Sequence, residues 1–135
     1  MYLFIMGGGN IIISGTIVKG LGEGAVFMSM PHYKEEIKKK LGFDAYPGTL
    51  NVKVAKQQFD SLKNNLPIKI QGYKKENKTF GSANCRKAKI KNISGAIIMP
   101  DINKHEDVIE FIAPVHLKSE LKLADGDKIK IKLID

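Results

Sequence analysis

The sequence lacks tryptophan, has a single cysteine and a single arginine, and contains no apolar run long enough to cross a bilayer. The lone Cys85 excludes an internal disulfide, and the three histidines stand far apart with no cysteine pair, which excludes the common zinc-binding spacings. The apolar opening, residues 1–6, stops at a run of glycines and has no basic segment before it, unlike a signal peptide. We therefore expect a reduced, cytoplasmic protein with no membrane association.

The net charge is positive, and nearly all of the basic residues are lysines. Lysine and arginine total 22 against 14 acidic residues, a formal net charge of +8, and Arg86 is the only arginine. Such a charge attracts nucleic acids and also small anions such as nucleotides. Nucleic-acid readers favour arginine and rows of stacking aromatics, so the composition counts against a nucleic-acid partner. Abundant surface lysine is also typical of heat-adapted proteins, which is an equally good explanation.

Length and patterning predict an all-β domain with two short helices. The 135 residues suffice for one domain, which we place at residues 11–135 after an N-terminal extension, 1–10. Short β-branched runs separated by turn residues favour a small barrel or sandwich over a βαβ series. The predicted strands are residues 11–19, 25–29, 49–54, 68–72, 79–86, 87–91, 95–99, 108–113 and 128–133, with some neighbours expected to merge.

Two segments have helical rather than strand spacing. In residues 31–41, Tyr33, Ile37 and Leu41 recur at intervals of four, a proline stands at the first position and Gly42 suits a left-handed end. The second predicted helix runs from about residue 114 to residue 121. We expect the apolar stripe of the first helix to face the core.

The segment around residue 50 predicts a pair of oxygen ligands. If residues 49–54 form a strand, alternate side chains face the core, and Thr49 and Asn51 lie together on the other face, roughly 6 to 7 Å apart along the backbone. A hydroxyl and a carboxamide oxygen can converge on a hard cation such as Mg²⁺, whose remaining ligands are waters and phosphates. An ordinary strand with two solvated polar residues is the alternative.

Three glycines at alternate positions, within residues 20–24, follow the first β-branched run. A backbone without Cβ atoms can bring its N–H groups close to an anion, so this segment could hold phosphates. It matches neither the Walker loop nor the dinucleotide fingerprint. A glycine-rich hairpin turn is the competing interpretation.

Several short motifs stand in one order along the chain: GLGEG at residues 20–24, PHYK at 31–34, LGF at 41–43, YPGTLN at 46–51, GAIIMP at 95–100, IAP at 112–114 and DGD at 125–127. Together they closely resemble the archaeal CTP-dependent riboflavin kinase family, over nearly all of residues 14–133. The resemblance implies a six-stranded Greek-key barrel of the cradle-loop type, similar to other riboflavin kinases. It also implies Mg²⁺-assisted transfer of a phosphate from CTP to riboflavin, giving CDP and FMN. We expect the chain to act as a monomer.

The resemblance assigns roles to individual residues. It implies that Mg²⁺ is bound by Thr49 and Asn51, that the flavin is contacted by Asn103 and Glu110, and that the nucleotide is contacted by Gly20, Leu21, Gly22, Glu23, Gly24, Ala25, Val115, His116, Leu117 and Lys118. Glu110 is also the candidate for orienting or deprotonating the riboflavin 5′-hydroxyl. An exposed strand glutamate without a catalytic role is the alternative.

Two other classes of function stay open at this stage. Barrels of the cradle-loop type include DNA-binding members, so a nucleic-acid-binding barrel without catalysis is the main alternative. Its binding would fall steeply with added salt and would not respond to riboflavin. A sensor of CTP or flavin would instead be stabilised by its ligand without turning it over.

Overall fold

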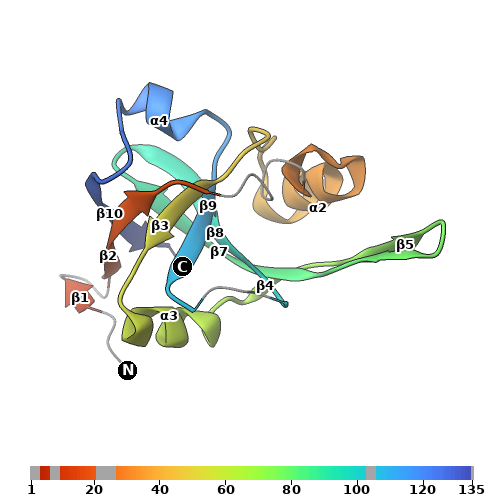
Figure 1. Ribbon diagram of the computed structural model, residues 1–135, viewed down its shortest axis with the longest axis horizontal. Helices are drawn as coiled ribbons and strands as arrows, with labels where there is room; N and C mark the ends of the chain where they lie inside the picture. Colours follow the sequence, from red (N-terminus) through yellow and green to blue (C-terminus); the bar gives the residue numbers. More distant parts are fainter. Residues whose placement is uncertain (1–3, 7–9, 21–26, 103–105, 135) are drawn as a thin grey trace.

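The computed structural model describes residues 4–6, 10–20, 27–102 and 106–134. Its strands and helices are mostly short, and the helices lie in the connections between strands (Figure 1). In chain order they are β1 (Phe4–Met6), β2 (Asn10–Val18), α2 (Pro31–Leu41), β3 (Leu50–Lys53), α3 (Lys56–Lys63), β4 (Ile68–Ile70), β5 (Tyr73–Lys75), β6 (Lys78–Phe80), β7 (Ala83–Ile90), β8 (Ile93–Pro100), β9 (Val108–Ile112), α4 (Leu117–Glu120) and β10 (Lys128–Leu133).

Six of the strands in the described part of the chain close into a barrel. The ring runs β2-β10-β7-β8-β9-β3 and closes where β3 pairs with β2, and every pairing in it is antiparallel. Strands β7, β8 and β9 follow one another as hairpins, and β10 returns to lie beside β7, which is the Greek-key order. The predicted fold class is therefore confirmed. Short strands β1 and β4 add to the ring by pairing with β2 and β7.

Two apolar cores lie on either side of the barrel wall. One core fills the barrel and includes Phe59 and Leu62 of α3, and the other lies between the wall and α2. Strand β8 contributes to both, since Ile97 belongs to the first core and Ile98 to the second. This explains the unbroken apolar run at residues 95–99, because a strand buried on both faces has no polar side to alternate with.

Helix α2 forms as its spacing predicts. Tyr33, Ile37 and Leu41 are buried, and Gly42 ends the helix with a φ of 86° while its N–H donates to Lys38 O at 3.0 Å. A positive φ is nearly free of strain in glycine, which is why the helix stops there. The Tyr33 hydroxyl donates to Gly81 O at 2.5 Å and so ties α2 to the segment before β7.

Some elements differ from the prediction. Residues 27–29 are helical, so the strand expected at 25–29 is wrong there, and residues 25 and 26 lie outside the described part. Helix α3 was not predicted, and α4 is shorter than the helix expected at 114–121. In place of a sheet contact, Phe27 stacks on Tyr33 of α2, with ring centroids 3.7 Å apart.

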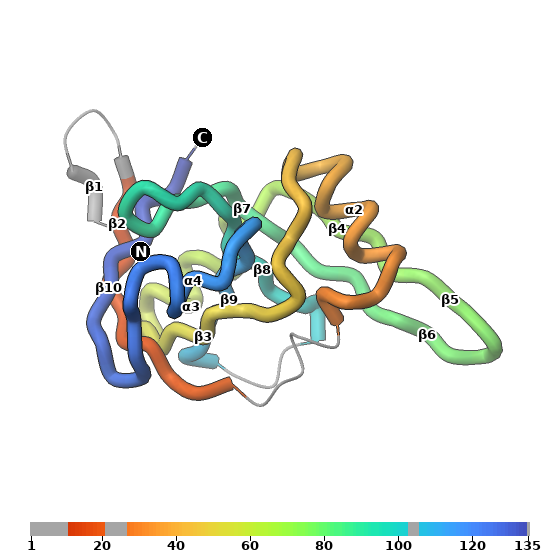
Figure 2. Tube along the Cα trace, turned by 90° about the horizontal axis from the view of Figure 1, so that it is seen from above, coloured from red at the N-terminus to blue at the C-terminus, as the bar shows by residue number. Residues whose placement is uncertain are grey.

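A hairpin, β5 and β6, extends away from the barrel (Figures 1 and 2). Its turn residues Glu76 and Asn77 have φ of 51° and 64°, as a two-residue hairpin turn requires. At its base, Tyr73 stacks on Phe80 with centroids 4.7 Å apart. No helix in the described part of the chain is long and apolar enough to span a membrane.

Candidate active site

Thr49 and Asn51 lie on the same side of the backbone at the start of β3. Leu50, Val52 and Val54 are buried in the barrel, whereas Thr49, before Leu50, and Asn51, after it, are only half-buried. The alternation expected from the sequence is therefore present, and both oxygen-bearing side chains face away from the barrel interior.

Glu110 joins this pair from the neighbouring strand. Asn51 is in register with Glu110 of β9, and the Thr49 hydroxyl donates to Glu110 Oε1 at 2.7 Å. Because the Thr49 proton is directed at the carboxylate, the lone pairs of its oxygen are left for another partner. Three hard oxygen donors from two adjacent strands thus gather at one place.

Gly20 lies directly against this cluster. A Cβ at position 20 would overlap the Asn51 carboxamide nitrogen and come within 2.9 Å of its Cγ. Any side chain at position 20 would therefore displace the Asn51 carboxamide from its present place. The remaining predicted loop residues, Leu21, Gly22, Glu23, Gly24 and Ala25, lie outside the described residues, but the segment they belong to begins beside Asn51.

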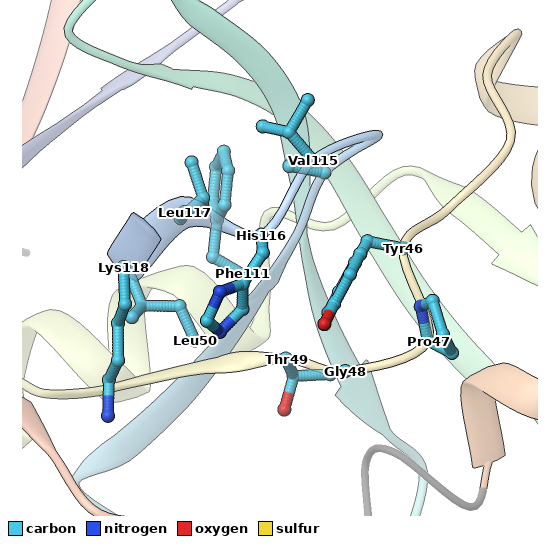
Figure 3. A pocket seen from close by; sticks show the side chains of 11 residues that line it. Tyr46, Pro47, Gly48, Thr49, Leu50, Phe111, Val115, His116, Leu117 and Lys118 are labelled. Carbon is cyan, nitrogen blue, oxygen red and sulfur yellow. The ribbon is translucent and has the colours of Figure 1, made fainter. Parts of the chain in front are cut away.

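A cavity of about 260 Å³ opens on one side of Thr49 (Figure 3). All four residues of the stretch predicted to contact the nucleotide, 115–118, line this cavity. Its lining residues are Tyr46, Pro47, Gly48, Thr49, Leu50, Phe111, Ala113, Val115, His116, Leu117 and Lys118. We call it the α4 cavity, since α4 forms part of its wall.

Two rings and a lysine shape the α4 cavity. The Tyr46 ring and the His116 imidazole lie near each other above Thr49, with centroids 5.0 Å apart (Figure 3). The Tyr46 N–H donates to Ala113 O at 2.8 Å, and His116 Nδ1 lies 2.6 Å from Ser119 Oγ. The Lys118 ammonium lies 2.6 Å from an Asp125 carboxylate oxygen. His116 is thus part of a cavity wall, and not only a surface residue of the helix.

A second and larger cavity, of about 450 Å³, is lined by both Thr49 and Glu110 of the cluster. Most of its wall is apolar, while Thr49, Ser82, Asp101 and Glu110 provide polar groups. Its lining residues are Phe27, Met28, Thr49, Gly81, Ser82, Ile98, Pro100, Asp101, Ile102 and Glu110. We call it the β8 cavity. Thr49 lines both cavities, so the hydrogen-bonded pair of Thr49 and Glu110 stands where they meet.

Asp101, at the edge of the β8 cavity, has a lowered pKa. The hydrogen bond from Lys69 Nζ, at 2.8 Å, is the main cause, followed by one from the Ser82 hydroxyl. The Asn84 amide also donates to this carboxylate, at 2.8 Å. Asp101 therefore stays ionised over the ordinary pH range.

A divalent cation at this site would rely on mixed oxygen donors. No group of three or more His, Cys, Asp and Glu residues that could hold a metal occurs within the residues that the structure describes. The Thr49 hydroxyl, the Asn51 carboxamide and the nearby Glu110 carboxylate are nevertheless ligands of the kind that Mg²⁺ accepts when water and phosphate complete its shell. The donor set fits the predicted metal.

The structure thus brings most of the predicted site residues together. Gly20, Thr49, Asn51 and Glu110 form one cluster, and residues 115–118 line the adjoining cavity. The predicted flavin contact Asn103 lies outside the described residues. Sequence reasoning missed Tyr46, although it begins the motif YPGTLN. It also missed Phe27 and Ile102 of the β8 cavity, for which no motif gave a signal.

Comparison with known proteins identifies the family. A family model named for CTP-dependent riboflavin kinases, and described as a domain of unknown function, DUF120, matches residues 17–133. The chain is 48% identical over 126 residues to "Riboflavin kinase" of Pyrococcus furiosus, covering 91% of this chain and 58% of that protein. It is 44% identical over 131 residues to "Riboflavin kinase" of Pyrobaculum islandicum, covering 92% and 61%.

A third relative, "Riboflavin kinase" of Methanocella arvoryzae, is 41% identical over 127 residues, covering 93% of this chain and 58% of that protein. The chain thus spans about six tenths of the length of these curated relatives. The match to the family model covers five of the six barrel strands and the end of the sixth, from the end of β2 to the end of β10. The chain belongs to the CTP-dependent riboflavin kinase family.

Proposed function

We propose that this chain is a riboflavin kinase that transfers the γ-phosphate of CTP to the 5′-hydroxyl of riboflavin, giving FMN and CDP. One observation carries the proposal: two cavities of different character meet at Thr49, which is hydrogen-bonded to Glu110. A phosphotransferase must hold donor and acceptor on either side of the transferred group, and this arrangement supplies two compartments with a polar junction.

The substrates are assigned by the chemistry of each cavity. The α4 cavity, with Lys118 and the rings of Tyr46 and His116, suits a nucleotide, whose base can stack on a ring. The β8 cavity has mainly apolar walls and is the larger, which suits the isoalloxazine ring of riboflavin. The ribityl chain would then point toward Glu110 and Thr49.

In the proposed reaction the riboflavin 5′-oxygen attacks the γ-phosphorus, and the bond from phosphorus to the β–γ bridging oxygen breaks. The hydroxyl proton leaves to Glu110 or to water, and CDP carries away the bridging oxygen. Glu110 also holds the Thr49 side chain in place, so we assign it two tasks: orienting Thr49 and orienting the 5′-hydroxyl.

Mg²⁺ is the proposed metal, held by Thr49 and Asn51. When bound, it would neutralise charge on the β- and γ-phosphates. Gly20 supports this assignment from the protein side, because its lack of a Cβ leaves room for the Asn51 carboxamide and brings the start of the proposed phosphate loop against it. The proposed loop residues, Gly20 to Ala25, would then surround the phosphates.

The test is an incubation of the purified chain with riboflavin, Mg²⁺ and each of the four nucleoside triphosphates in turn, with FMN measured by chromatography. We expect FMN mainly with CTP, and none when EDTA is present. Binding of CTP and riboflavin without any FMN would instead support a sensor, and salt-sensitive binding to nucleic acid with no response to riboflavin would support the DNA-binding alternative. Light scattering during gel filtration would test the expected monomer.

A further inference from the structure

An apolar side chain stands unusually exposed at the β8 cavity. Ile102 is 88% exposed, yet it lines this cavity together with Phe27, Met28 and Ile98. A single exposed isoleucine on an open surface would need no explanation. At the rim of an apolar cavity, however, it is placed to lose its contact with water when a planar apolar ligand enters.

Asp101, the residue before Ile102, is held in place by several hydrogen bonds. Both oxygens of the Asp101 carboxylate accept hydrogen bonds, from Lys69 Nζ and the Ser82 hydroxyl on Oδ2 and from the Asn84 amide on Oδ1. The Asp101 N–H also donates to Ser82 O at 3.0 Å. These partners belong to β4, to β7 and to the segment before β7, so the backbone at residue 101 is fixed to the barrel wall from several directions.

Phe27, which also lines the β8 cavity, is held in place by ring stacking. One face of its ring stacks on Tyr33 of α2, with centroids 3.7 Å apart and planes 23° from parallel. Tyr33 is itself fully buried and bonded to Gly81, another residue of the cavity wall. Phe27 is therefore backed by the core and cannot easily withdraw from the cavity.

We propose that Ile102 covers the isoalloxazine ring of bound riboflavin, and that Asp101 is the positioning residue that holds Ile102 over the β8 cavity. The proposal rests on the proposed function, because it names the residues that set the affinity for its acceptor substrate. The planar, largely apolar ring system matches the wall formed by Phe27, Met28, Ile98 and Ile102.

The size of the effect follows from the apolar area that Ile102 would bury. Shortening Ile102 to alanine removes three carbon atoms, and if about half of their surface is covered by the ring, riboflavin binding should weaken about tenfold. Because the side chain is almost fully exposed without ligand, the same change should leave the folded protein itself nearly unaffected.

The experiment titrates riboflavin into each variant and follows the quenching of its fluorescence, with the KM for CTP measured in parallel. Ile102→Ala should raise the riboflavin Kd about tenfold and leave the KM for CTP unchanged, while Ile102→Leu should restore binding close to that of the parent. Asp101→Ala should also weaken riboflavin binding, by about threefold or more. Asp101→Asn provides a second variant should the alanine protein fail to fold.

The double variant tests whether Asp101 acts through Ile102. If it does, Asp101→Ala combined with Ile102→Ala should bind riboflavin little worse than Ile102→Ala alone.

Two control variants make the same kinds of substitution at positions outside the β8 cavity. Asp44→Ala removes an acid paired to Lys38 at 3.0 Å, and Ile134→Ala shortens a partly exposed isoleucine that lines neither cavity. Both should bind riboflavin like the parent.

The outcomes separate this proposal from the proposed function. If the parent protein binds and phosphorylates riboflavin but Ile102→Ala binds it within twofold of the parent, the assignment of Ile102 is wrong and the kinase assignment stands. Fully additive losses in the double variant would overturn the positioning role of Asp101. A parent protein that neither binds nor phosphorylates riboflavin would overturn both proposals.

Discussion

Replacing Thr49 by valine tests the centre of the proposed site. The change keeps the β-branched shape and removes only the hydroxyl. That hydroxyl donates to Glu110 at 2.7 Å, and a hydrogen bond to a carboxylate contributes roughly 1.5–3 kcal/mol when buried. Both residues are only half-buried, so we expect a loss of about 1 kcal/mol in unfolding free energy, or about 4 °C in Tm.

The expected effect on activity is much larger than the effect on stability. Valine removes one proposed ligand of Mg²⁺ and frees Glu110 to turn away from the 5′-hydroxyl. Losing one preorganised polar group at a reacting centre typically lowers the rate about 100-fold or more, which is about 2.7 kcal/mol. We therefore expect kcat/KM for FMN formation to fall about 100-fold, and to fall further when Mg²⁺ is limiting.

The assay measures FMN formation over a range of Mg²⁺ concentrations, with Tm measured on the same samples. Thr49→Ser is the matched control, because it keeps the hydroxyl and should retain most of the activity. If Thr49→Val formed FMN within about threefold of the parent rate at every Mg²⁺ concentration, neither the metal assignment nor the role of the Glu110 hydrogen bond could stand.

Three further predictions concern other residues. Gly20→Ala should displace the Asn51 carboxamide, which a Cβ would overlap, and lower FMN formation at least tenfold; an unchanged rate would contradict the close approach. Burial raises the pKa of Cys85 to about 12, so iodoacetamide at pH 8 should leave it unmodified by mass spectrometry until the protein is unfolded. The pKa of Asp101 lies below its ordinary value of 3.8, chiefly because of the Lys69 hydrogen bond, so its contribution to stability is present above about pH 4 and is lost as the pH falls through the lower folded value. Urea unfolding should therefore find the parent more stable than Asp101→Asn at pH 6, and this difference in unfolding free energy should shrink as the pH is lowered below 4.

Local patterns were sufficient to predict much of the barrel. The strict alternation in residues 128–133 appears as β10, with Ile129, Ile131 and Leu133 buried. The four-residue spacing in α2 and the glycine that ends it were equally readable. These features depend on a residue's near neighbours, which the sequence contains directly.

Residues 27–29 and 56–63 could not be predicted in the same way. Phe27 and Met28 are apolar and adjacent, which suits a strand as well as a helix, and only the stacking of Phe27 on Tyr33 decides between them. In α3, Phe59 and Leu62 supply the apolar face, too few for a clear periodic signal. Tertiary packing overrides local preference in both segments.

The candidate site combines both kinds of information. Thr49 and Asn51 are two residues apart, so their shared face follows from strand geometry alone. Glu110 is 61 residues from Thr49 and reaches it only because the Greek-key order places β9 beside β3. No local rule gives that pairing, and the family resemblance brought Glu110 into the prediction as a flavin contact without its bond to Thr49. Through this hydrogen bond Glu110 holds Thr49, which lines both cavities. A substitution of Glu110 should therefore weaken metal binding as well as flavin binding. Substitutions of Thr49 and of Glu110 should therefore have non-additive effects on the kinetics of FMN formation, although the two residues are far apart in the sequence. A double-mutant cycle between Thr49 and Glu110 would measure this coupling.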